Sequence, residues 1–126
     1  MKKILVDMTA SIIHHGHVRL IKKASKFGKV YVALTTDKEV KKYKGYYPEL
    51  NYNQRKEIIS EFKSVFKVIP SKWVISQKFL DKNSINLIVS GSDYNSRKFK
   101  TKSINFSRTK AISSNLIRNK ISSTMK

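Results

Sequence analysis

The chain of 126 residues contains no cysteine and few acidic side chains, and none of its apolar runs is long. The absence of cysteine excludes disulfide bonds and thiolate metal sites, and it fits a reducing compartment. No apolar run approaches the ~20 residues that a membrane-spanning helix needs. The start of the chain resembles the beginning of a signal peptide, but Asp7 ends its apolar stretch too early. We therefore expect a cytoplasmic protein.

The scarcity of acidic residues leaves a formal net charge of +19, from 27 lysines and arginines against 8 acidic residues. Such an excess attracts polyanions, among them nucleic acids, acidic membrane surfaces and nucleotide phosphates. Most of the basic residues are lysines spread along the whole chain, which is typical of a solvated surface. They are densest over residues 97–126, where we expect an anion site.

Apolar runs alternate with amphipathic segments along the chain, and this alternation predicts a parallel, doubly wound sheet. Strands are expected over residues 3–8, 30–35, 66–69, 87–90 and 103–106. Helices are expected over residues 18–27, 53–65, 74–82 and 112–120. Gly28 is expected to end the first helix, and residues 41–52 to form a loop. We predict one domain over residues 1–126, a Rossmann-like α/β fold of about five strands flanked by helices.

Four polar segments directly follow expected strands. Because parallel strands end at the same edge of a sheet, these segments are expected to face one crevice, where such sheets bind ligands. The first contains His14 and His17 at the start of a helix, where unpaired N–H groups and the helix dipole favour anions. The others are residues 35–37, 91–94 and 108–109. This arrangement indicates phosphate chemistry.

Several short motifs resemble the nucleotidyltransferase superfamily, and in particular its small cytidylyltransferases. His14, Gly16 and His17 match the HxGH signature of the superfamily. Residues 44–45 resemble the lysine loop of the family, and residues 53–55 resemble the start of its next helix. Three later segments resemble its VIP, GDDW and RTEGIST motifs: residues 68–70, 91–94 and 108–114, in that order. Residues 112–114 together with Arg118 also fit the ISSTxxR motif of the wider superfamily.

The resemblance implies transfer of CMP from CTP to a phosphorylated small alcohol, with release of pyrophosphate. Glycerol 3-phosphate, which would give CDP-glycerol, is the first candidate acceptor. The resemblance also implies a homodimer and Mg²⁺ carried by the nucleotide, held by phosphates and water rather than by protein ligands. An attacking phosphate needs no strong base, so donors aimed at the phosphates are expected to supply most of the catalysis.

The candidate site residues fall into three groups. Catalytic contacts to the phosphates are assigned to His14, His17, Lys44 and Arg108. Nucleotide binding is assigned to residues at strand ends and in the expected last helix: Thr9, Ala10, Gly16, Arg55, Gly91, Asp93, Ile112, Ser113, Ser114 and Arg118. Acceptor binding is assigned to residues in and after the first two strands: Asp7, Ser11, Thr36 and Asp37. His15 occupies the variable position of the motif and is expected to be peripheral.

Three alternatives stay open. Ala10 and Ser11 stand where the family has Phe and Asp, and Asp7 resembles an acidic residue of relatives that act on amino alcohols. A phosphorylated amino alcohol or an aminophosphonate is therefore a second candidate acceptor, because a carboxylate favours an ammonium group. The second alternative is an adenylyltransferase, which would use ATP in place of CTP. Tyrosines beside lysines over residues 43–52 also leave open a basic protein that binds nucleic acid and has no activity.

Overall fold

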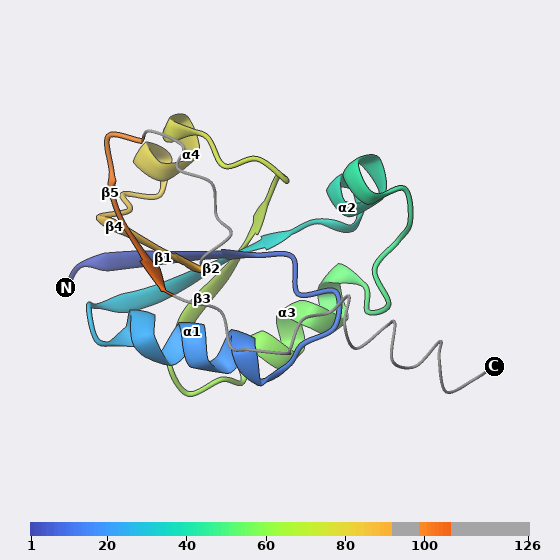
Figure 1. The fold of residues 1–126 in the computed structure, drawn as a ribbon, viewed down its shortest axis with the longest axis horizontal. Helices are drawn as coiled ribbons and strands as arrows, with labels where there is room; N and C mark the ends of the chain where they lie inside the picture. The colour runs from blue at the N-terminus through green and yellow to red at the C-terminus, as the bar shows by residue number, and fades with distance from the viewer. Residues whose placement is uncertain (92–98, 107–126) are drawn as a thin grey trace.

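The computed structural model describes residues 1–91 and 99–106 of the chain. Over these residues five parallel strands form one sheet in the order β3-β2-β1-β4-β5 (Figure 1). The strands are β1 (Lys3–Met8), β2 (Lys29–Thr35), β3 (Val65–Ser71), β4 (Leu87–Gly91) and β5 (Lys102–Phe106). The order changes direction at β1, as in other doubly wound sheets. The predicted α/β fold and its five strands are confirmed.

Helices cover both faces of the sheet. Those in the described part of the chain are α1 (His15–Ser25), α2 (Asp37–Lys44), α3 (Tyr52–Ser60) and α4 (Gln77–Lys82). In Figure 1, α1 and α3 lie below the sheet and α4 lies above it, whereas α2 projects beyond it at the right. None of these helices is long and apolar enough to cross a membrane. The expected last helix, residues 112–120, lies outside the described residues.

The core has two parts because the strands bury apolar side chains on both faces. Alternation along β1 directs Ile4 and Val6 toward α1 and α3, where they pack with Ile21 and Ile59. Leu5 points to the other face. There it joins residues of β2, β4, α4 and the segments that flank α4: Ala33, Ile75, Leu80, Ile85 and Ile88. Burial on both faces explains why β1, β2 and β4 are largely continuous apolar runs in the sequence.

The sequence predicts a loop at residues 41–52, and this prediction is wrong in its first part because α2 extends to Lys44. α2 buries only Val40, so it lacks the apolar periodicity by which helices are recognised. Its signals are electrostatic, with acidic residues in the first turn and lysines in the last. Gly45 follows in the left-handed conformation (φ 82°), which is a helix-ending signal.

Several other boundaries differ from expectation; for example, α3 ends at Ser60 rather than at residue 65, and α4 begins at Gln77 rather than at residue 74. β3 continues through Pro70, which has no N–H to donate, and this is tolerated because β3 is an edge strand. Gly28 was expected to cap α1, but the cap residue is Lys26, in a right-handed conformation. Gly28 is instead required by a close approach of two backbone segments. A Cβ at this position would lie 2.3 Å from the backbone oxygen of Lys2, which also accepts the Lys29 N–H at 2.9 Å.

We predict that Gly28→Ala lowers the free energy of unfolding by about 1–3 kcal/mol, because the added methyl group meets backbone rather than a mobile side chain. Urea denaturation of the wild type and the variant measures the difference. An unchanged free energy of unfolding would contradict the close approach.

Candidate active site

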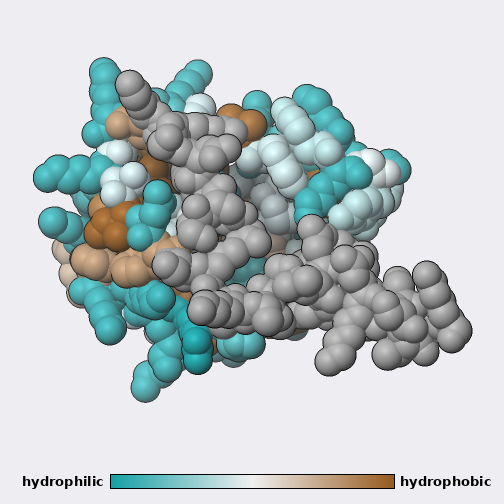
Figure 2. All heavy atoms as spheres, viewed as in Figure 1, coloured by the Kyte–Doolittle hydropathy of each residue, from teal (hydrophilic) through white to brown (hydrophobic). Residues whose placement is uncertain are grey.

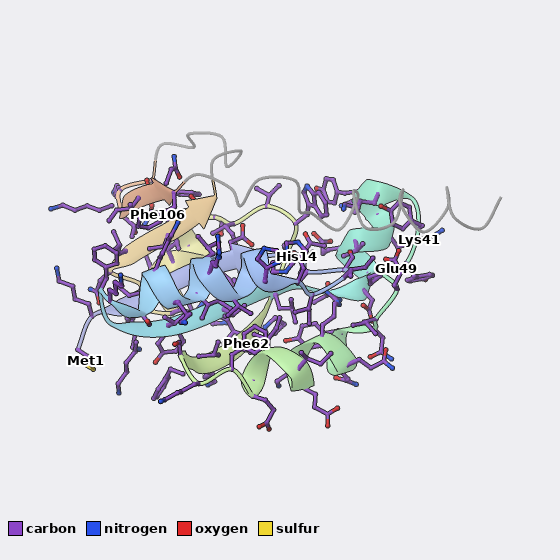
Figure 3. All side chains as sticks on the ribbon, turned by 60° about the horizontal axis from the view of Figure 1, so that its bottom comes forward. Met1, His14, Lys41, Glu49, Phe62 and Phe106 are labelled. Carbon is purple, nitrogen blue, oxygen red and sulfur yellow. The ribbon has the colours of Figure 1, made fainter. Side chains whose placement is uncertain are left out.

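The carboxyl ends of the strands form the edge at which the candidate segments meet. β1 is followed by residues 9–14 and α1, β2 by Thr36 and α2, and β4 ends at Gly91. Figure 3 shows His14 at the end of α1 that lies toward α2. The remaining candidates lie outside the described residues, and their roles stay predictions: Asp93, Arg108, Ile112, Ser113, Ser114 and Arg118.

His14 and His17 form a reciprocal cap at the start of α1. His14 is the N-cap residue, with an extended backbone, and its Nδ1 accepts a hydrogen bond from the Gly16 N–H at 3.1 Å. The His14 N–H in turn donates to Nδ1 of His17, also at 3.1 Å. The two ring centres are 4.0 Å apart, and the ring planes are inclined by 32°. Each side chain thus satisfies a backbone donor that the start of a helix leaves open.

These hydrogen bonds determine where each imidazole carries its proton. A ring nitrogen that accepts a bond from a backbone N–H is not itself protonated, so the proton of each neutral ring is on Nε2. Both histidines therefore present an Nε2–H donor from a fixed position at the positive end of α1. His15, between them in the sequence, is exposed.

The loop between β1 and α1 contains two departures from ordinary local structure. Ala10 is buried and adopts a left-handed backbone conformation (φ 50°), which is strained for a residue with a Cβ. Ser11 is 1% exposed, and its Oγ has no hydrogen-bond partner among the described residues. A buried hydroxyl in this state costs the free energy of its desolvation. Ser11 thus keeps its place as a candidate contact for a polar ligand.

Arg55 is a buried cation that ties together the segments of this edge. Its side chain is 0% exposed, and its Nε donates to the Leu50 carbonyl at 3.0 Å. Nη1 donates to the carbonyls of Thr9 and Thr35, at 2.7 and 2.8 Å. Nη2 pairs with Oδ1 of Asp37 at 2.7 Å. The guanidinium thereby connects the loop after β1, the end of β2, the start of α2 and the loop before α3.

This environment corrects the role expected of Arg55. The predicted nucleotide contact would need an accessible guanidinium, whereas this one is enclosed by protein oxygen atoms. Arg55 acts as a positioning residue, because it holds the Thr9 carbonyl, on the segment that leads to His14, against the end of β2. Its charge is tolerated inside the protein only with these partners, since an unpaired buried cation is very costly.

Asp37 is also engaged within the protein. Oδ1 pairs with Arg55, and Oδ2 accepts the Tyr52 N–H at 3.0 Å. The Asp37 side chain is still 33% exposed, so its role in acceptor binding stays a prediction. The Tyr52 ring lies 5.8 Å from the guanidinium carbon of Arg55. Its hydroxyl is buried without a partner in the described part of the chain. Burial raises the pKa of Tyr52 and the charge of Arg55 opposes this, so the phenol stays protonated near neutral pH.

Three further candidates lie in β1, just before α2 and at the end of α2. Lys44 is half-buried at the end of α2, with Nζ 5.8 Å from the centre of the Trp73 ring. The Thr36 N–H donates to the Ser71 carbonyl at 3.1 Å, which joins the start of α2 to the end of β3. Asp7 is half-buried in β1 and, by strand alternation, points to the face of the sheet opposite α1.

We predict that Arg55→Met lowers the free energy of unfolding by about 3 kcal/mol or more, because it leaves Asp37 and several carbonyl groups without their donor. Lys56→Met removes an exposed cation from the same helix and is the matched control, expected to change stability by less than about 0.5 kcal/mol. Urea denaturation compares the two variants. Equal stabilities would show that the buried network contributes nothing.

Comparison with known proteins shows which family the chain matches. A family model described as cytidylyltransferase-like matches residues 6–125. The chain is 31% identical to the glycerol-3-phosphate cytidylyltransferase of Staphylococcus aureus (strain NCTC 8325 / PS 47), with 96% of each chain covered. It is 30% identical to the protein of the same name from Bacillus subtilis (strain 168), covering 96% of this chain and 98% of that one.

The fold also matches a solved structure. The lipopolysaccharide core biosynthesis protein from Thermoplasma volcanium GSS1 superposes with a TM-score of 0.76 at 21% identity, covering 86% of this chain and 98% of that one. The resemblance drawn from the short motifs is confirmed by the family match over nearly the whole sequence. The chain therefore belongs to the cytidylyltransferase-like family of nucleotidyltransferases.

Proposed function

We propose that the chain transfers CMP from CTP to glycerol 3-phosphate, forming CDP-glycerol and releasing pyrophosphate. Two relatives named glycerol-3-phosphate cytidylyltransferase, which align with 96% of the chain, support this acceptor. The observation that carries the proposal is the reciprocal cap of His14 and His17, which fixes two Nε2–H donors side by side. Two neutral donors at the positive end of a helix suit the oxygen atoms of a triphosphate.

In the proposed reaction, a phosphate oxygen of the acceptor attacks the α-phosphorus of CTP. A bond forms to that oxygen while the bond to the bridging oxygen of pyrophosphate breaks, and pyrophosphate leaves with the electron pair. The attacking oxygen is already anionic near neutral pH, so no strong general base is required. The task of the protein is to orient the attack and to stabilise negative charge, which we assign to the donors of His14 and His17.

Positive charge for the leaving pyrophosphate is assigned to Lys44 and, beyond the described residues, to Arg108 and Arg118. We propose that Mg²⁺ is held by the phosphates and water, where it would neutralise part of the phosphate charge. Within residues 1–91 and 99–106, His, Asp and Glu side chains form no group of three that could hold a metal ion. The placement of Mg²⁺ on the nucleotide rests on the family resemblance.

The direct test is pyrophosphate release from CTP or ATP in the presence of each candidate acceptor. We expect turnover with CTP, fastest with glycerol 3-phosphate and slower with phosphoethanolamine, phosphocholine or 2-aminoethylphosphonate. A preference for one of the amine-bearing compounds would assign the acceptor to that class. The absence of pyrophosphate release from CTP with every acceptor would overturn the proposed function.

We predict that His14→Asn lowers kcat by at least about 100-fold while the protein stays nearly as stable as the wild type. Asn is a good N-cap residue whose side-chain oxygen can still accept the Gly16 N–H, whereas the Nε2–H donor is lost. His14→Ala loses both functions and is expected to be less stable by about 1 kcal/mol.

Steady-state kinetics and urea denaturation separate the two roles of His14, and the exposed His15 supplies the control variant His15→Ala, for which we expect little change in either measurement. A His14→Asn enzyme with near-normal kcat would show that His14 serves only the helix.

A further inference from the structure

The two lysines near the end of α2 differ in what their ammonium groups contact. Lys42 is exposed, and its Nζ lies 5.4 Å from the ring centre of Tyr43, its neighbour in the same helix. Lys44 is half-buried, and its Nζ lies 5.8 Å from the ring centre of Trp73, which belongs to the segment after β3. Lys44 is therefore directed back from α2 toward the carboxyl edge of the sheet.

Trp73 is held in place independently of Lys44. Its backbone N–H donates to Oε1 of Glu39 at 3.0 Å, which attaches this segment to the first turn of α2. Its indole stacks on the ring of Tyr43, with the ring centres 5.5 Å apart and the planes inclined by 13°. The indole is thus a fixed surface between the helix and the sheet edge, on which the mobile side chain of Lys44 rests.

We propose that Trp73 is a positioning residue for Lys44: its indole holds the ammonium group at the sheet edge until a phosphate of the nucleotide takes that group over. α2 projects beyond the sheet (Figure 1), and the surface around it is hydrophilic to neutral (Figure 2), so a lysine at its end would otherwise extend into solvent. An ammonium over an indole keeps its charge and is only weakly held, so a phosphate oxygen displaces the ring. This inference rests on the proposed role of Lys44 in binding the triphosphate.

The chain offers a direct spectroscopic test because Trp73 is its single tryptophan. The chain also has six tyrosines, so the protein is excited at a wavelength that tryptophan absorbs and tyrosine does not, and the emission then reports on this ring alone. Titration with pyrophosphate, and separately with CTP, is expected to give a saturable change in intensity as the ammonium leaves the indole. Lys44→Met is expected to alter the fluorescence before any addition and to lose most of the response. Lys42→Met removes the same charge from the same helix, and we expect it to retain both the resting signal and the response.

Kinetics test whether the contact matters for the nucleotide. Trp73→Leu is expected to raise KM for CTP about threefold to fivefold with kcat little changed, because an ammonium group that is no longer placed at the sheet edge must be ordered when the nucleotide binds. Trp73→Phe keeps a ring face and is expected to recover part of that loss. Lys44→Met is expected to raise KM tenfold or more, roughly the effect of losing one charged contact. In the Lys44→Met background, Trp73→Leu is expected to add nothing, because both residues act through one contact.

The outcomes separate this proposal from the proposed function. Equal resting fluorescence of Lys44→Met and Lys42→Met, or an undiminished effect of Trp73→Leu in the Lys44→Met background, would overturn the positioning role. A purely structural Trp73 would also lower the melting temperature of both Trp73 variants. If instead the proposed function fails, the wild type releases no pyrophosphate with any acceptor, while the fluorescence response and its dependence on Lys44 persist.

Discussion

The guanidinium of Arg55 determines how the chain leaves two neighbouring strands. It donates to the Thr9 carbonyl just after β1 and to the Thr35 carbonyl at the end of β2. These carbonyl groups point out of the sheet ladder, and burial would leave them without a donor. By joining them to Asp37 and to the loop before α3, one side chain sets the starting points of α1 and α2. The histidine pair and Lys44 are both carried by these helices, so the geometry of the site depends on this buried ion.

The cap of α1 gives a physical reason for the spacing of the HxGH motif. His14 and His17 occupy the N-cap position and the third helical position, which are the two partners of a reciprocal capping arrangement. Capping uses Nδ1 of each ring, and this leaves the proton on Nε2. The interaction that stabilises the start of the helix therefore also selects the tautomer that donates to a phosphate. Nδ1 of each ring serves the helix cap, and Nε2 of the same ring is the atom that we propose as the donor to phosphate.

The sequence predicts what depends on local pattern and misses what depends on long-range contacts. The central strands β1, β2 and β4 were predictable because both of their faces are buried and their sequences are largely apolar. The edge strands β3 and β5 carry shorter apolar segments and several exposed positions. α2 was missed because its stability comes from charges at its ends and from Gly45 rather than from an apolar face. The role of Arg55 was not predictable, since two of its three carbonyl partners are 20 and 46 residues away along the chain and meet it only in the folded protein. Arg108 and Ser113 stay predictions from the motif alone.

The loop between β1 and α1 places a strained backbone next to a buried hydroxyl group, and both lie between two segments that are held by hydrogen bonds. Ala10 is left-handed and Ser11 is buried without a partner among the described residues. On one side the Thr9 carbonyl is held by Arg55, and on the other His14 begins a capped helix. A change of backbone conformation at either residue would disturb one of these hydrogen-bonded segments. The surrounding structure therefore keeps the strained conformation despite its free-energy cost. These are also the positions at which the chain departs from the Phe-Asp pair of its family. Because natural proteins break local rules mainly at functional sites, this loop is where we expect the chain to contact a ligand.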